Sequence, residues 1–157
     1  MELEKAIKQR TSTRTFKDQQ IPVEDLKKMV QMGGTAPRVS NYQPWKFYVI
    51  TNKRLMEKMA DIIKDKIEQI PENESKASRN IKSQVEWFAT FFENAPALIA
   101  LTMEEYESVL EKGVTVSHED INKMRNYPDI QSAGAAIQNI LLTAVDMGYG
   151  ACWMSAP

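Results

Sequence analysis

The segment Arg10-Thr11-Ser12-Thr13-Arg14 carries two guanidinium groups and a hydroxyl at alternate positions. In extended backbone, alternate side chains point the same way, so Arg10, Ser12 and Arg14 would share one side. Planar guanidinium groups with a hydroxyl between them are suitable donors for a phosphate dianion. A phosphate site and a solvated loop with incidental charge are both compatible with this segment.

A second segment, residues 35–45, combines prolines with amide side chains and includes Pro37, Asn41, Gln43 and Pro44. Prolines stiffen the backbone, and an amide offers both a donor and an acceptor. Such a loop suits recognition of a flat heterocycle with alternating hydrogen-bonding groups. A structural turn whose amides cap neighbouring backbone is the competing interpretation.

A third segment begins at Gln138-Asn139 in an apolar run and continues past Gly148 to Cys152-Trp153-Met154. It reads as a core helix that leads into a core strand, so any function would depend on backbone donors just beyond the strand. No GxxxxGK[ST] loop is present, and no GxGxxG follows a strand, so neither common glycine-loop nucleotide site is expected.

Composition excludes several classes of function. The 157 residues carry a net charge of −1, which excludes a strong basic field for duplex nucleic acid. One histidine and one cysteine make a His/Cys zinc site in a single chain close to excluded, and we expect no metal. The start of the chain lacks a signal peptide, and the longest apolar stretch is far shorter than the ~20 residues that span a bilayer. We therefore expect a cytoplasmic protein that binds neither nucleic acid nor membrane.

Apolar spacing predicts the elements that position these segments. Helices are expected over residues 2–9, from Pro22 to a stop at Gly33-Gly34, and over 55–70, 81–92 and 130–147. Strands are expected over residues 45–50 and 97–103, with another beginning at 151–154. Between them lie a polar break over residues 71–80, a short helix within 104–112 and a capping box at Ser117 and Asp120. This order predicts an α+β fold in one domain, residues 1–157, with a small sheet covered by helices.

Taken in order, the three segments resemble the nitroreductase family of FMN-dependent oxidoreductases. The matching pieces are residues 10–16, Ala36-Pro37 with residues 41–45, and residues 138–153. The resemblance implies an α+β fold with a small, mostly antiparallel central sheet, and a homodimer with FMN at the subunit interface. It also implies ping-pong hydride transfer, in which NAD(P)H reduces flavin N5 and an electron-poor acceptor, such as a nitroaromatic or a quinone, is then reduced.

The resemblance also implies which residues bind the flavin. Arg10 and Ser12 would bind the phosphate and ribityl end, Thr11 would contribute backbone, and Arg14 would lie near N1 and O2 of the ring. The partner subunit would contribute the loop that contains Pro37, Arg38, Val39 and Asn41. Backbone N–H groups at Ser155 and Ala156 would point toward N5, and no side chain would act as a catalytic acid or base.

The sequence departs from the family pattern at three places. Arg38 and Val39 stand where small residues usually let backbone approach the flavin. The family normally continues with a strand and a helix beyond position 157, so we expect this sequence to be part of a longer protein. The family's lysine near the pyrimidine ring has no aligned counterpart, although Lys76 or Lys82 could serve. A flavin-binding storage or sensor module and a flavin-dependent reductive dehalogenase are the alternative functions.

Three other features have plain structural interpretations. We expect His118 to be a solvated residue at a helix start and Cys152 to be a buried, inert thiol. The aromatic residues between positions 87 and 92 should be mostly core, with a surplus face suited to an interface or a pocket wall. Tyr106 and Tyr127 lie where a variable lid is expected.

Overall fold

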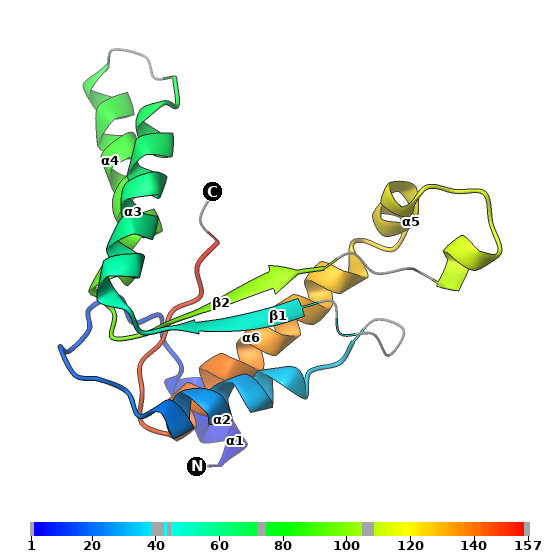
Figure 1. Ribbon diagram of the computed structural model, residues 1–157, viewed down its shortest axis with the longest axis horizontal. Coiled ribbons are helices and arrows are strands. Elements are labelled where there is room, and N and C mark those ends of the chain that lie inside the picture. Colours follow the sequence, from blue (N-terminus) through cyan, green and yellow to red (C-terminus); the bar gives the residue numbers. More distant parts are fainter. Residues whose placement is uncertain (1, 39–42, 44, 72–74, 105–108, 156–157) are drawn as a thin grey trace. The chain divides into compact units, whose positions relative to one another are not determined.

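The computed structural model describes residues 2–38, 43, 45–71, 75–104 and 109–155. In chain order its elements are α1 (Leu3–Gln9), α2 (Val23–Gly34), β1 (Trp45–Ile50), α3 (Lys53–Glu68), α4 (Lys76–Thr90), the 3-10 turn η2 (Phe91–Asn94), β2 (Leu98–Met103), the 3-10 turn η3 (Val109–Lys112), α5 (His118–Met124) and α6 (Pro128–Asp146) (Figure 1). The strands β1 and β2 pair in a small antiparallel sheet, so the predicted α+β class is confirmed. None of the described helices combines the length and apolar character that crossing a membrane requires.

The chain divides into two compact units, each of which makes most of its contacts within itself. The first unit contains the chain up to Arg10, Pro22–Tyr48 and Ala100–Tyr149. The second unit contains Thr11–Ile21, Val49–Ile99 and the chain from Gly150 onward.

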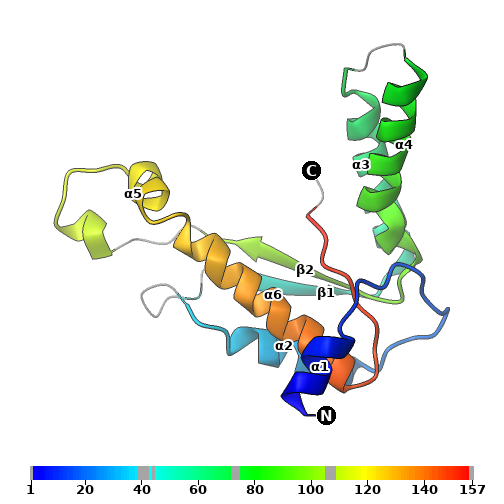
Figure 2. The ribbon, with the colours of Figure 1, turned by 180° about the vertical axis from the view of Figure 1, so that it is seen from behind.

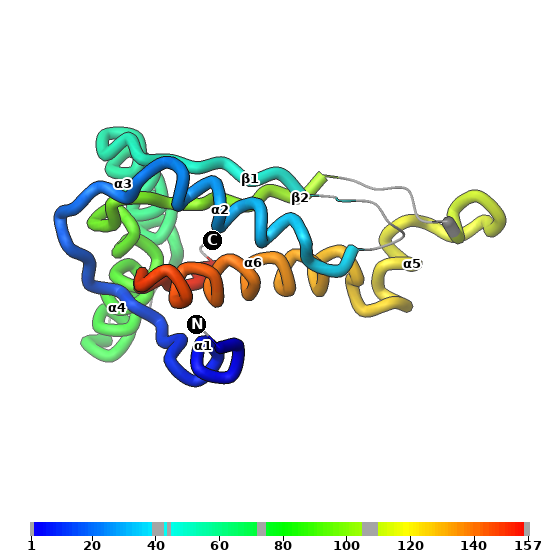
Figure 3. The backbone as a smooth tube through the Cα atoms, turned by 90° about the horizontal axis from the view of Figure 1, so that it is seen from below, coloured from blue at the N-terminus to red at the C-terminus, as the bar shows by residue number. Residues whose placement is uncertain are grey.

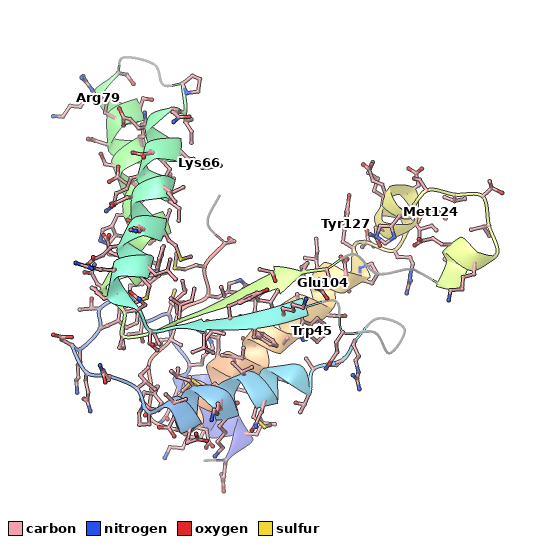
Figure 4. The ribbon with its side chains drawn as sticks, in the orientation of Figure 1. Trp45, Lys66, Arg79, Glu104, Met124 and Tyr127 are labelled. Atoms are coloured by element: carbon pink, nitrogen blue, oxygen red, sulfur yellow. The ribbon has the colours of Figure 1, made fainter. Side chains whose placement is uncertain are left out.

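In the first unit, α6 packs against α2 and α1 (Figures 2 and 3). As predicted, α2 stops at the glycine pair, with Gly34 as its last residue. Gly33 also has a packing role: a Cβ on it would lie 2.8 Å from Ile140 Cγ1, so only glycine lets the two helices approach this closely. Trp45, at the start of β1 in Figure 4, is buried with Ala36 and Ala136.

The first unit also contains the segment from η3 to α5. Ser117 caps α5 as the predicted capping box requires, since its Oγ accepts a hydrogen bond from Asp120 N at 3.1 Å, while Asp120 Oδ2 accepts from Ser117 Oγ at 2.6 Å. The helix expected within residues 104–112 is only the single 3-10 turn η3 in the described part of that range. Figure 4 labels Met124 and Tyr127 on either side of the α5–α6 junction. Tyr127 has a φ of 52°, and Tyr106 lies outside the described residues.

The expectation for His118 was wrong. Its Nδ1 lies 2.7 Å from Glu111 Oε1, and its Nε2 lies 2.8 Å from Asn122 Nδ2. Asn122 is buried, so its amide requires a polar partner, and the imidazole supplies one. His118 is therefore a half-buried member of a polar network rather than a solvated helix-start residue.

In the second unit, α3 and α4 form a helical hairpin, with Lys66 and Arg79 near its tip in Figure 4. The break predicted over residues 71–80 is too long, because Ser75 Oγ accepts from Ser78 N at 3.1 Å and starts α4 at Lys76. The apolar pattern begins only at Ile81 and therefore misses this polar first turn. Lys82 Nζ donates to the carbonyl of Glu68 at 2.7 Å, which joins α4 to the end of α3.

Candidate flavin site

The segment that begins at Thr11 runs beside the C-terminal tail within the second unit. Ser12 forms an isolated parallel bridge with Ala151, and Thr13 N donates to Ala151 O at 3.0 Å. A Cβ on Gly150 would lie 2.6 Å from Thr13 Oγ1, so Thr13 and the tail are in close contact. Among the described residues of the tail, the strand expected over 151–154 is reduced to this one bridge.

Arg14 and Phe16 of the same segment pack against aromatic residues of α4 and η2. The Arg14 Cζ atom lies 5.3 Å from the centroid of the Phe88 ring. The Phe16 ring stacks on Phe91 with 6.3 Å between centroids and 15° between planes. The segment is thus held by the tail through Ser12 and Thr13 and by the helical hairpin through Arg14 and Phe16.

The aromatic residues after Glu86 divide into a buried pair and an exposed pair. Phe91 and Phe92 are buried, as expected for core, whereas Trp87 is 51% and Phe88 44% exposed. Trp87 contacts Phe88 edge-on at 4.8 Å between centroids, and its ring lies 6.0 Å from Phe91. The surplus aromatic face that the sequence suggested therefore exists, and Arg14 lies against it.

The charge of Arg14 is not neutralised by any carboxylate in the described part of the chain. Arg14 is half-buried, and its Nε is buried with no hydrogen-bond partner among the described residues. Lys64, in the same unit, is by contrast neutralised: it pairs with Glu93 at 3.0 Å, and this hydrogen bond raises the pKa of Lys64. A buried donor without a partner is costly, so the orphaned Nε marks Arg14 as a candidate to bind an anionic or acceptor-rich ligand.

The other expected phosphate ligands belong to different units, Arg10 to the first and Thr11 and Ser12 to the second. Ser12 is exposed in the second unit, and its backbone is fixed by the bridge to Ala151. Thr11 is also exposed. Arg10 is the half-buried residue directly after α1 in the first unit, where its backbone N–H donates to Ala6 O at 3.0 Å.

The remaining expected residues are placed only in part. Pro37 and Arg38 are exposed residues of the first unit, directly after the buried Ala36. Ser155 is exposed at the end of the described tail, whereas Val39, Asn41 and Ala156 lie outside the described residues.

The tail contains one correction and one residue that sequence reasoning missed. Cys152 is half-buried rather than buried, because this part of the tail is not a core strand. Met154 packs against the buried cluster of Met56, Ala60 and Phe92, and so anchors the tail immediately before Ser155. The apolar run from Ala151 to Met154 is the signal that could have identified this anchor.

Two candidates from the sequence have other roles in the structure. Lys82 is mostly buried and donates to the carbonyls that end α3, so its ammonium is already bound there. Lys76 is exposed at the first position of α4. Within the described ranges, no group of three His, Cys, Asp or Glu side chains is placed to hold a metal ion.

Comparisons with known proteins show the family and the fold of this chain. The sequence profile of the nitroreductase family matches residues 7–157. A BluB-like flavoprotein from Clostridium difficile 630 is 33% identical with a TM-score of 0.82, and the match covers 99% of this chain and 74% of that one. A nitroreductase with bound FMN from Bacteroides fragilis NCTC 9343 is 23% identical with a TM-score of 0.71, covering 98% and 69%.

The curated relatives are longer than this chain. A protein of Archaeoglobus fulgidus, provisionally named an NADH dehydrogenase/NAD(P)H nitroreductase, is 26% identical over 153 residues, which cover 96% of this chain and 65% of the relative. Iodotyrosine deiodinases are also among the relatives. The chain spans between 43% and 68% of the length of the first four curated relatives.

Proposed function

The chain belongs to the nitroreductase family, and on that premise we propose that the protein is an FMN-dependent NAD(P)H oxidoreductase. The observation that carries the proposal is Arg14, whose guanidinium lies against an aromatic face with a buried, unpartnered Nε. Beside it, Ser12 presents an exposed hydroxyl on fixed backbone. These groups fit a ligand that is both anionic and rich in acceptors, as FMN is.

Each flavin-binding residue has a separate task in this proposal. Arg10 and Ser12 bind the phosphate and ribityl end, and Thr11 adds a backbone contact. Arg14 faces the N1 and O2 side of the ring, where a fixed cation favours the negative charge that accumulates on reduction. When bound, FMN supplies the atom that accepts and returns hydride, so the protein needs no side chain as nucleophile or general base.

Backbone groups and a second subunit complete the proposed site. The loop of Pro37, Arg38, Val39 and Asn41 would come from the partner subunit of a homodimer, with FMN at the interface. Backbone N–H groups of Ser155 and Ala156 would orient N5. Met154 supports this role, because its packing in the core fixes the backbone that leads to Ser155.

The proposed partners are NAD(P)H as donor and a small electron-poor aromatic molecule, such as a nitroaromatic or a quinone, as acceptor, in the cytoplasm. The name of the Archaeoglobus relative supports this donor and the nitroaromatic acceptor class.

The test uses the full-length protein. We expect it to be yellow, or to bind added FMN, and to lose flavin absorbance when mixed anaerobically with NADH or NADPH. Arg10→Ala should weaken FMN binding, whereas Arg54→Ala, at an exposed arginine of α3, should leave it unchanged. A protein that fails to bind FMN overturns the proposal. Flavin that binds but stays oxidised with both nicotinamides identifies a storage or sensor module instead.

Reductive dehalogenation is the second candidate, because several relatives are named iodotyrosine deiodinases. One of them, from Haliscomenobacter hydrossis, is 31% identical over 87% of this chain. Comparing an iodotyrosine with a nitroaromatic as the acceptor for the reduced protein separates the two. Iodide release at a rate above that of nitro reduction would identify a dehalogenase.

A further inference from the structure

The contact between Arg14 and Phe88 indicates a role for a residue outside the flavin-binding segment. A guanidinium within about 6 Å of a ring centroid is attracted by the negative face of the ring. The 5.3 Å from Arg14 Cζ to Phe88 satisfies this distance. No carboxylate among the described residues competes for the guanidinium, so the Phe88 ring is the partner that orients it.

The ring is itself held in place. Trp87 contacts Phe88 edge-on at 4.8 Å, and Trp87 lies 6.0 Å from Phe91. Phe91 is buried and stacks on Phe16, two residues after Arg14. The aromatic array therefore anchors the segment at Phe16 and the guanidinium at Phe88, which restricts where the Arg14 side chain can lie.

An aromatic partner has a different consequence from a carboxylate. A carboxylate would hold the guanidinium by neutralising its charge and by occupying its N–H donors. A ring face holds the cation and leaves both its full charge and its N–H groups available. In agreement with this, no carboxylate among the described residues occupies the Nε of Arg14, which is buried and unpartnered.

We propose that Phe88 is a positioning residue that holds the Arg14 guanidinium, with its charge unpaired, toward the pyrimidine side of the flavin. The proposal rests on the proposed function, since it assigns how one residue of that site is oriented. Phe88 does not contact the reacting atoms in this proposal. It sets how strongly Arg14 favours reduced over oxidised flavin.

The test replaces the ring without removing apolar bulk. We expect Phe88→Leu to weaken FMN binding roughly 3- to 30-fold and to lower the two-electron reduction potential of the bound flavin. If the loss of affinity is 3- to 10-fold larger for reduced than for oxidised FMN, the potential falls by roughly 14–30 mV. Phe88→Trp retains a stronger π-face and should restore both quantities to near the wild-type values.

Two controls separate positioning from a structural role. Ile81→Ala removes an exposed apolar side chain from the same helix and should leave both affinity and potential unchanged. In an Arg14→Met background, Phe88→Leu should have no further effect, because the cation that it orients is gone. Thermal unfolding of the apoproteins verifies that every variant is folded.

The outcomes are distinct. A wild-type protein that binds no FMN overturns the proposed function and this assignment together. FMN binding and potential that are unaffected by Phe88→Leu overturn the assignment alone. An equal loss in the wild-type and Arg14→Met backgrounds also overturns it, because the effect then does not act through Arg14.

Discussion

The contact between Gly150 and Thr13 offers the sharpest test of how the tail holds the proposed flavin-binding segment. The φ of Gly150 lies outside the left-handed region, so an alanine is allowed there by backbone conformation and only space opposes it. Its Cβ would lie 2.6 Å from Thr13 Oγ1 and 2.9 Å from both Cβ and Cγ2. Thr13 is branched at Cβ, so no long flexible side chain can move aside.

Gly150→Ala should therefore separate the tail from the segment. Overpacking costs about 1–3 kcal/mol, and loss of the hydrogen bond from Thr13 N to Ala151 O adds about 1 kcal/mol. A loss of roughly 2–4 kcal/mol would lower the melting temperature by about 4–16 °C in a chain of this size. If the tail moves instead and stability is preserved, the displaced Ser12 should bind FMN more weakly.

The assay combines chemical denaturation of the apoprotein with FMN titration. Gly34→Ala is the matched control, because nothing lies within 4 Å of its added Cβ. At the end of α2 it should raise stability by up to about 1 kcal/mol. If Gly150→Ala changes neither unfolding nor FMN affinity, the close contact between tail and segment does not exist in solution.

Three further predictions concern single contacts. Gly33→Ala should lower the free energy of unfolding by about 1–3 kcal/mol, because its Cβ meets Ile140 between α2 and α6; a stability equal to that of wild type would contradict this packing. The Tyr149 hydroxyl donates to Asp25 at 2.5 Å, which raises the pKa of Tyr149 above 10.0. The stabilisation from this hydrogen bond is complete below pH 10 and is lost as pH rises through the folded-state pKa of Tyr149. The melting temperature of wild type should therefore show this additional decrease at alkaline pH, whereas that of Tyr149→Phe should not. Ser12→Ala should weaken FMN binding roughly 10- to 100-fold, as expected for a hydrogen bond to a charged group, with the melting temperature of the apoprotein unchanged because the bridge uses backbone.

Much of the fold follows from local patterns in the sequence. The strand β1 spans the predicted residues 45–50, and β2 begins one residue later than expected. The sequence does not predict the tertiary contacts. The helix stop at Gly33-Gly34 is confirmed, but the missing side chain of Gly33 is also needed for contact with Ile140, 107 positions away in the chain. This second requirement becomes apparent only when the two helices are placed together.

For the candidate site too, the sequence predicts local chemistry but not tertiary contacts. Residue type alone suggests that Arg14 and Ser12 could bind an anion, although a solvated loop was also compatible with the sequence. The contacts that Arg14 and Ser12 make could not be predicted from the sequence. Phe88 and Ala151 lie far along the chain, and no local sequence pattern marks either of them as a partner. His118 shows the reverse error, since a helix-start position suggested solvent while the buried Asn122 demanded a polar neighbour.

The orphaned Nε of Arg14 links stability to ligand binding. A buried donor without a partner costs the folded apoprotein roughly 1–3 kcal/mol, and the π-face of Phe88 offsets part of that cost without removing the charge. By mass action, a ligand that binds the folded state alone adds about 2.7 kcal/mol of stability at a concentration one hundred times its Kd. A carboxylate in place of Phe88 would give the Arg14 N–H groups hydrogen-bond partners in the apoprotein. It would then compete with the ligand for those same N–H donors. An aromatic partner therefore favours binding of an anionic ligand at the expense of the stability of the ligand-free protein, as the proposed flavin site requires.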